Sequence, residues 1–326
     1  MNRRLLQGGT VVTDLGSFPA DVLIEGERIA NIGPGLIADG AEVVHVHGRL
    51  VLPGGVDPHT HFDLPMFDTV SSDDHYTGHK AAAYGGTTTV MDFVPQLASG
   101  SLEAGLDVWM EKAAPKAAID FAFHLNISRL EAAVLAEIER LPSRGVTSVK
   151  VFTAYNSRLR LQDGEIFRVL RKAGEQGMLT MLHAESGDVI DILVAEALAA
   201  GHRSPVWHAR TRPAWGAVEA TLRGIALAAQ AGAPLYIVHV NVAGEVDQIR
   251  YARERGLPVM GETCPPYLFF TEDDLARPDG AKWVCSPPMR TPADNQALWE
   301  GLTAGDLQTI GTDHCPFFFD GTQPIE

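Results

Sequence analysis

Histidines at alternating positions are the residues of this sequence best suited to chemistry. His59 and His61 are two positions apart, so on a β-strand their side chains point to the same face and can reach one metal ion. A second pair, His45 and His47, precedes a turn at Gly48 and has no partners in its own short segment. We interpret that second pair as ordinary strand residues. A His-x-His motif is therefore weak by itself, and only additional ligands make one a candidate site.

Three more ligand-type side chains follow short apolar runs. His183 and His239 each follow apolar strand residues, and Asp313 follows Gly311, which would allow a close approach of the backbone. Taken singly, each histidine is more often a core residue bonded to the backbone, and the aspartate could cap a helix or turn. Together the two histidines would supply two nitrogen ligands for a second metal, and Asp313 would supply a carboxylate at the end of the last strand.

Lys150 lies inside the apolar run 148–152, where a charged amine is costly. It could pair with a nearby carboxylate or extend its amine toward solvent. A functional interpretation follows from the ligands around it, because two metals held close together need an anionic bridge and this run has no Asp or Glu. A neutral amine can react with CO₂ to give a carbamate with two oxygens, and burial favours the neutral amine.

The candidate ligands offer nitrogen and oxygen atoms, so zinc is the first choice, and manganese, cobalt or nickel could replace it. Cys315 is close to Asp313 in the sequence, but no base is placed for it apart from the metal ligands. We therefore interpret Cys315 as a buried thiol. His124 and His314 could contact the ligands from behind. The histidines that we expect to be ordinary are His75, His79, His202 and His208.

The elements that must position these residues alternate regularly from Leu50 onward. Short apolar or β-branched runs alternate with helical patterns about eight times, which predicts an α/β protein with a (β/α)₈ TIM-like barrel. Catalytic groups of such barrels lie at the C-terminal ends of the strands, where these ligands fall. The predicted strands are 52–61, 87–94, 119–126, 147–153, 179–185, 235–240, 258–263 and 307–313. The main predicted helices are 102–114, 129–140, 164–176, 214–231 and 243–255.

The first 50 residues have a different pattern of short β-like segments separated by glycine turns. They predict a small antiparallel unit of hairpins. We therefore expect two domains, a small β domain over residues 1–50 and a barrel over residues 51–326. The predicted short strands are 10–12, 21–24, 28–32 and 42–46.

The composition limits the partners. The chain has 326 residues with 26 Lys and Arg against 41 Asp and Glu, a net charge of −15, and no basic stripe, so we expect it to bind neither nucleic acid nor an anionic membrane. No apolar run is long enough to cross a bilayer, and the start of the chain lacks the pattern of a signal peptide. The cysteines number three and lie far apart, which favours a reducing cytoplasm.

Six motifs are spread over essentially the whole length of the chain. They are Gly54–His61, Val149–Phe152, His183–Glu185, Gly261–Pro265, Cys285–Pro288 and Gly311–Pro316. Together they resemble the motifs of the dihydropyrimidinase and D-hydantoinase family of cyclic amidohydrolases. The resemblance implies a distorted barrel with a small β-sandwich, and hydrolytic ring opening of 5,6-dihydropyrimidines and hydantoins by a metal-bridged hydroxide at a dinuclear zinc centre. It also implies a homo-oligomer, either a tetramer or a dimer.

The resemblance also implies roles for particular residues. His59, His61, Asp313 and a carboxylated Lys150 would hold one metal, and the same lysine would bridge to a second metal. Asp313 would also carry a proton from the attacking hydroxide to the leaving ring nitrogen. The other ligands of the second metal would be His183 and His239.

Substrate contacts are expected from the loops after the first and fourth strands. Tyr155 matches the tyrosine of the family that polarises the substrate carbonyl, and Ser286 matches a serine that contacts substrate; otherwise they would be an exposed aromatic and part of a proline-rich turn. These two loops would also form an apolar wall that selects the substituent on the ring. The alternative is that the residues of the wall only pack the loops onto the barrel. The wall is predicted from Phe62, Leu64, Met66, Phe67, Phe152 and Leu159.

The sequence departs from the family pattern at its C-terminal end. It stops at Glu326, soon after the last predicted strand. We therefore expect a fragment that lacks the final barrel helix and the rest of the small β-sandwich. The missing segment would also supply a substrate-binding asparagine. The nearest alternatives are dihydroorotase and allantoinase, which usually carry an arginine soon after the first His-x-His, where Phe62–Pro65 stands here. A non-catalytic scaffold of the same fold is the alternative of another class, but such scaffolds have lost metal ligands that this chain keeps.

Overall fold

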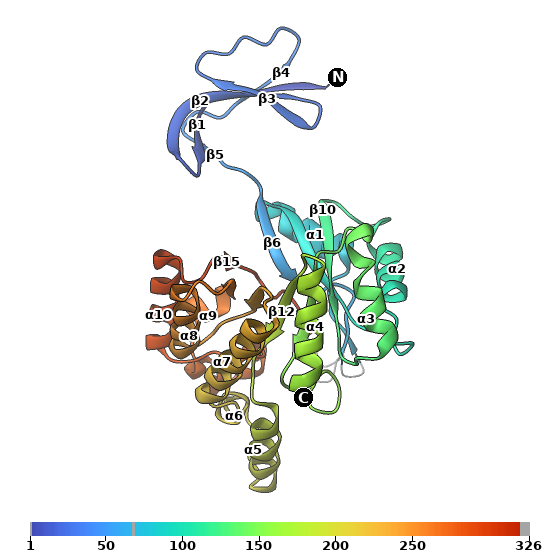
Figure 1. Cartoon of the computed structure of the whole chain (residues 1–326). Coiled ribbons are helices and arrows are strands. Elements are labelled where there is room, and N and C mark those ends of the chain that lie inside the picture. Colours follow the sequence, from blue (N-terminus) through green and yellow to red (C-terminus); the bar gives the residue numbers. More distant parts are fainter. Residues whose placement is uncertain (1, 67–68, 320–326) are drawn as a thin grey trace. The chain divides into compact units, whose positions relative to one another are not determined.

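The computed structural model describes residues 2–66 and 69–319 (Figure 1). The chain divides into two compact units, Met1–Gly55 and Val56–Glu326. Among the described residues, no helix is long and apolar enough to cross a membrane. The second unit contains every residue that we predicted to hold metal or substrate.

The first unit is a five-stranded sheet in the order β3-β2-β1-β4, with β5 also paired to β1. Strands β1 to β3 are antiparallel neighbours, as predicted, and Val11, Ala20 and Val22 form a small core. Strands β4 and β5 instead pair with β1 in parallel, so the prediction of a purely antiparallel unit was wrong. Because β3 also runs parallel to β1, residues 34–41 must cross over the sheet before β4 begins. The strands are β1 (Arg3–Thr13), β2 (Gly16–Glu25), β3 (Arg28–Gly33), β4 (Glu42–His45) and β5 (Leu50–Val51).

The second unit is built on an eight-stranded sheet in the order β15-β14-β13-β12-β11-β10-β9-β6. The first and last strands approach each other, because Thr60 forms a parallel bridge to His314 and the His61 amide donates to the His314 carbonyl at 2.9 Å. The predicted barrel is therefore confirmed. Its strands are β6 (Gly55–Thr60), β9 (Thr87–Val94), β10 (Asp120–Asn126), β11 (Ser148–Phe152), β12 (Leu179–His183), β13 (Leu235–Ile237), β14 (Val259–Thr263) and β15 (Thr309–Ile310).

Helices follow most of these strands and cover the outside of the sheet (Figure 1). Helix α4 shows why: Ile166, Val169, Leu170 and Ala173 recur at helical spacing and are all buried, while the opposite side of the helix is charged. The short hairpin β7 (Pro65–Met66) and β8 (Thr69–Val70) precedes α1. The α-helices are α1 (His75–Tyr84), α2 (Leu102–Ala113), α3 (Ala132–Ile138), α4 (Asp163–Glu175), α5 (Gly187–Ala199), α6 (Val206–Arg210), α7 (Ala214–Ala231), α8 (Ala243–Glu254), α9 (Pro265–Phe269) and α10 (Pro292–Ala304).

Irregular backbone follows the strands that carry predicted site residues. Tyr155, His239 and Asp313 have φ angles of 64°, 42° and 51°, in the left-handed region that side chains other than glycine seldom adopt. The predictions that strands extend to Val240 and to Asp313 were therefore wrong, because β13 ends at Ile237 and β15 ends at Ile310. Such strain persists only where surrounding structure imposes it, and it gathers at functional sites.

Candidate metal centre

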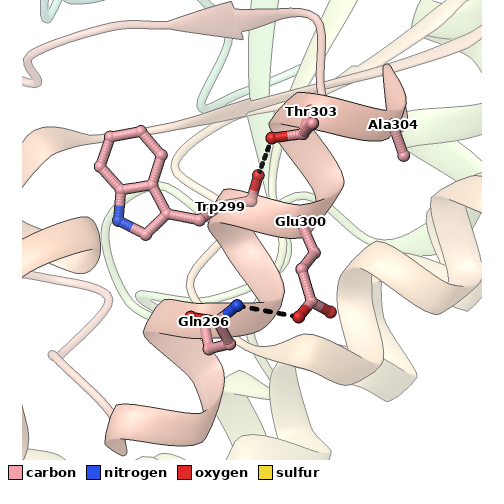
Figure 2. Close-up of a pocket in the computed structure, with 5 residues that line it drawn as sticks. All are labelled: Gln296, Trp299, Glu300, Thr303 and Ala304. Atoms are coloured by element: carbon pink, nitrogen blue, oxygen red, sulfur yellow. Dashed lines mark hydrogen bonds between the residues drawn. The ribbon is translucent and has the colours of Figure 1, made fainter.

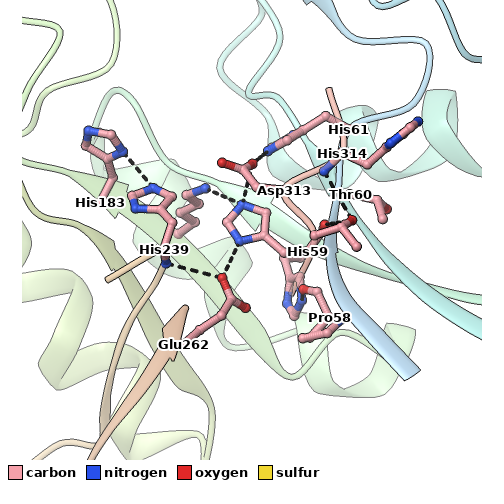
Figure 3. A network of polar contacts seen from close by, with 12 residues as sticks. Pro58, His59, Thr60, His61, His183, His239, Glu262, Asp313 and His314 are labelled. Atoms are coloured by element: carbon pink, nitrogen blue, oxygen red, sulfur yellow. Dashed lines mark hydrogen bonds and ion pairs between the residues drawn. The ribbon is translucent and has the colours of Figure 1, made fainter. Parts of the chain in front are cut away.

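Two histidines and one carboxylate meet at the end of β6. The Nε2 atoms of His59 and His61 each lie 3.1 Å from the same Oδ1 of Asp313 (Figure 3). Burial alone would raise the pKa of the Asp313 carboxyl, but the two histidines outweigh burial and hold this pKa well below its usual value. An ionised carboxylate beside two imidazoles is a suitable ligand set for a divalent metal.

Lys150 joins this group from β11. Its Nζ lies 3.0 Å from Nε2 of His59 and 4.2 Å from the centre of the Phe93 ring, and the residue is 3% exposed. Burial lowers the pKa of the amine, which favours its neutral form. The amine is therefore placed against the first histidine of the site.

His183 and His239 form the other side of the cluster. Nδ1 of His183 lies 2.9 Å from Nε2 of His239, and both residues are buried. Burial, followed by the neighbouring His183, lowers the pKa of His239 well below its usual value, which favours the neutral imidazole. Contacts therefore run from Asp313 through His59 to Lys150 on one side of the cluster. On the other side, His183 and His239 contact each other (Figure 3).

The donor set is suited to divalent ions. Among the described residues, the His, Cys, Asp and Glu side chains able to hold a metal include His59, His61 and Asp313, whose ligand atoms all lie within 4.8 Å of one another. Imidazole nitrogen and carboxylate oxygen are donors that zinc accepts, and no thiolate is needed. Of the other three predicted ligands, His183 and His239 contact each other, and Lys150 contacts His59.

Two buried glutamates form hydrogen bonds with histidines of the cluster, and neither was predicted to have a role. Glu262 accepts a hydrogen bond from Nδ1 of His59 at 2.6 Å, and Glu185 accepts one from Nε2 of His183 at 2.8 Å. Both glutamates lie within the quoted motifs, so a signal was present. The partner of Glu262 could not be read from spacing, because Glu262 and His59 are 203 residues apart, whereas Glu185 is only two residues from His183.

Tyr155 and Ser286 lie on the same side of the cluster as His183. The Tyr155 ring centre is 5.0 Å from that of His183, and its hydroxyl interacts with Ser286. Burial raises the pKa of the Tyr155 hydroxyl, so it keeps its proton and can donate a hydrogen bond. His208, which we expected to be ordinary, lies 3.0 Å from Oγ of Ser286 and 2.8 Å from the Cys285 carbonyl.

The predicted apolar wall divides into different environments. Phe152 is buried, with its ring centre 5.7 Å from that of His183, and Leu159 is half-buried in the loop after β11. Leu64 is buried, and its amide donates to the Ser71 hydroxyl at 3.0 Å. Phe62 packs its ring against His75 and His79 of α1 at centre-to-centre distances of 5.6 and 5.4 Å. Phe67 lies outside the described residues, and Met66 is half-buried in β7.

The remaining candidates lie around the cluster. His124 bonds to the Ser148 hydroxyl and to the Pro58 carbonyl, the latter at 3.0 Å, and its ring centre is 4.6 Å from that of Phe93. His314 lies with its Nε2 2.7 Å from an oxygen of Asp73. Burial raises the pKa of the Cys315 thiol, which suits an inert thiol better than a nucleophile.

A separate surface cavity of about 310 Å³ lies along α10 (Figure 2). It is lined by Gln296, Trp299, Glu300, Thr303 and Ala304. Its one ionisable side chain, Glu300, already accepts a hydrogen bond from Gln296 at 2.9 Å. This cavity therefore offers little chemistry, and the polar cluster at the strand ends remains the candidate site.

Comparison with known proteins gives concordant matches. Residues 50–324 match the Amidohydrolase family. The chain is 46% identical to a D-hydantoinase of Streptomyces coelicolor and 45% identical to one of Geobacillus stearothermophilus, covering 99% of this chain and 71% and 69% of those proteins. The crystal structure of a dihydropyrimidinase from Brevibacillus agri superimposes with a TM-score of 0.96 at 48% identity, covering 98% of this chain and 70% of that one.

Proposed function

This chain belongs to the amidohydrolase family, together with D-hydantoinases and dihydropyrimidinases, and on that premise we propose that it opens cyclic amide rings by hydrolysis. The substrates would be 5,6-dihydropyrimidines and hydantoins. The observation that carries this proposal is the convergence of His59, His61, Lys150 and Asp313 at the ends of three barrel strands, with a pair of buried histidines beside them. A scaffold without catalysis would have no reason to bring all of these polar groups together.

We assign two zinc ions to this cluster. His59, His61 and Asp313 would hold one ion, and His183 and His239 would hold the other. Lys150, as a carbamate, would bridge them. This assignment is supported by the position of the Lys150 amine against His59 and by its apolar surroundings, where a free ammonium group would be costly.

Two neighbouring divalent ions supply Lewis acidity, which makes water nucleophilic near neutral pH and polarises a carbonyl oxygen. The residues of the chain do the rest. Asp313 accepts the proton of the attacking water and passes it to the ring nitrogen as the C–N bond breaks. Tyr155 donates its hydroxyl proton in a hydrogen bond to the carbonyl oxygen as negative charge develops there.

Substrate orientation would come from the groups around Tyr155. Ser286 interacts with the Tyr155 hydroxyl and with His208, so it is placed to contact a ring amide. Leu64, Phe152 and Leu159 would form the apolar side that accommodates the substituent on the ring. Assembly into a homo-oligomer, a tetramer or a dimer, is part of the same proposal and rests on the family resemblance.

Zinc-loaded protein assayed with dihydrouracil, hydantoin and substituted hydantoins tests the proposal. We expect ring opening of at least one of them and about two zinc ions per chain by elemental analysis. A chain that binds zinc but opens none of these rings would contradict the proposed substrates. A chain that holds no more than trace metal after zinc loading would contradict the proposed centre.

A further inference from the structure

Glu262 is the most completely buried carboxylate next to the candidate metal centre. It lies on β14 and has no exposed surface. Around the barrel, β15 separates β14 from β6, so the Glu262 side chain must extend through the interior to meet His59 on β6 (Figure 3). A buried carboxylate is costly unless its oxygens are satisfied, and its partners therefore indicate its purpose.

Both oxygens of Glu262 have partners. Oε1 lies 2.6 Å from Nδ1 of His59 and 3.3 Å from the His239 amide, which donates to it. Oε2 accepts from the Tyr236 hydroxyl at 2.9 Å, and that hydroxyl also bonds to Thr309. The carboxylate is therefore held in one orientation by Tyr236 and is aimed at His59.

The contact determines which nitrogen of His59 faces the cluster. With Nδ1 occupied by Glu262, Nε2 is the atom that lies 3.0 Å from Nζ of Lys150 and 3.1 Å from Oδ1 of Asp313. A histidine whose Nδ1 carries the proton has its lone pair on Nε2, and a carboxylate on the Nδ1 side makes that lone pair more basic.

Gly311 provides the space for this arrangement. A Cβ atom at position 311 would lie 2.7 Å from Oε2 of Glu262 and 2.8 Å from Cβ of His59. Any other residue would therefore push the glutamate or the histidine away. The close approach that we predicted for Gly311 from the sequence occurs here, at the contact between these two side chains.

We propose that Glu262 is a positioning residue of the metal centre, which fixes the orientation and proton location of His59 so that Nε2 is presented to the metal. Tyr236 acts on His59 only through Glu262. This inference rests on the proposed function, because it assumes that His59 binds a metal.

The test compares zinc retention by the full chain and by Glu262→Gln. The substitution keeps the shape of the side chain but removes its charge. Loss of partners of this kind typically lowers metal affinity by 10–100-fold. We expect Glu262→Gln to lose zinc to a competing chelator at roughly 10–100-fold lower chelator concentration than the unchanged chain. With cobalt in place of zinc, the visible absorption bands should also change, since they report ligand geometry.

Glu245→Gln is the matched control. Glu245 is also buried, on α8, and accepts from the Asn241 and Val242 amides and the Thr221 hydroxyl rather than from a histidine. The Glu245→Gln variant should retain zinc as the unchanged chain does. Equal zinc loss in both variants would show that a weakened barrel is responsible and would overturn the proposal.

Tyr236→Phe keeps the test decisive if Glu262→Gln does not fold. It leaves the carboxylate in place and removes the hydroxyl that holds it. Zinc retention should therefore decrease, but by a smaller factor than we expect for Glu262→Gln. Normal zinc retention and unchanged cobalt bands in every variant that folds would refute the positioning role. An unchanged chain that binds zinc without opening cyclic amides would contradict the proposed function alone, since zinc retention would still be measurable.

Discussion

The chain contains the His-x-His motif twice, and the two copies lie in opposite environments. His45 and His47, in and just after β4, are exposed, and their ring centres are 5.8 Å apart. His59 and His61 have ring centres 5.2 Å apart, but His59 is fully buried and both point at Asp313. Within the described part of the chain, only the second pair belongs to a group of His, Cys, Asp and Glu side chains that could hold a metal ion.

The difference teaches that distant strands, rather than the motif, create the site. The His59 pair receives a carboxylate from the segment after β15, an amine from β11 and a second carboxylate from β14. Among the described residues, the strands around His45 supply no group that would join it in a metal site. The partners of His59 and His61, which His45 and His47 lack, can be removed one at a time. The resulting loss of activity or bound zinc should rank these partners by importance.

Removal of Lys150 should have the largest effect. Lys150→Ala would delete the proposed bridge between two metals, so activity on the best cyclic amide should fall to background. A small carboxylic acid added to the assay should restore part of it by standing in for the carbamate. High-resolution density that shows an unmodified amine between two bound metals would be inconsistent with this role.

Removal of one histidine from each pair tests the comparison directly. His61→Ala should lower zinc content by about one ion and reduce kcat by more than the roughly 10²–10³-fold expected for a single lost oxyanion donor. His45→Ala, the matched change at the exposed copy, should retain both zinc ions and change the free energy of unfolding by no more than about 0.5 kcal/mol. Equal zinc loss in the two variants would mean that the two copies are not distinguished as we argue.

Tyr155→Phe should have a smaller effect than either ligand change. The ring next to His183 remains, but the hydroxyl that donates to the developing oxyanion is lost, so kcat should fall by roughly 10²–10³-fold for every substrate. Zinc content should be unchanged, which separates this variant from the ligand variants. If only the ranking among substrates changed, Tyr155 would belong to the specificity wall instead.

Regular parts of the barrel could be predicted from sequence alone. The strand 87–94 and the helix 214–231 were predicted with the bounds that the structure shows. The strand is a short run of β-branched and apolar residues that follows two glycines, and the helix has apolar residues at helical spacing. The ligand positions were also accessible, since barrel topology brings strand ends together. Local pattern and topology were therefore sufficient for the frame and for the first set of candidate residues.

The remaining features depend on contacts that no local pattern encodes. Strands β13 and β15 end early because His239 and Asp313 adopt positive φ angles, which tertiary packing imposes. Glu262 looked like one more strand residue, although its partner lies on a strand 203 residues away. The parallel pairing of β4 was likewise missed, because segment composition does not reveal strand direction.

Changes in the apolar wall should have the smallest effects on catalysis, and the structure separates two leucines there. Leu159 is half-buried in the loop after β11, so Leu159→Ala should enlarge the wall at little cost in stability. We expect kcat/KM to shift toward bulkier substituted hydantoins by about tenfold, near the lower limit for a small change in an apolar pocket.

Leu64 is 6% exposed and is held to Ser71 through its backbone, so Leu64→Ala should lower the free energy of unfolding by about 2–5 kcal/mol. A panel of substituted hydantoins and a denaturant titration would measure both quantities for both variants. If Leu159→Ala left the substrate ranking unchanged while lowering stability as much as Leu64→Ala, both leucines would only pack their loops onto the barrel, and selection of the substituent would have to come from other residues.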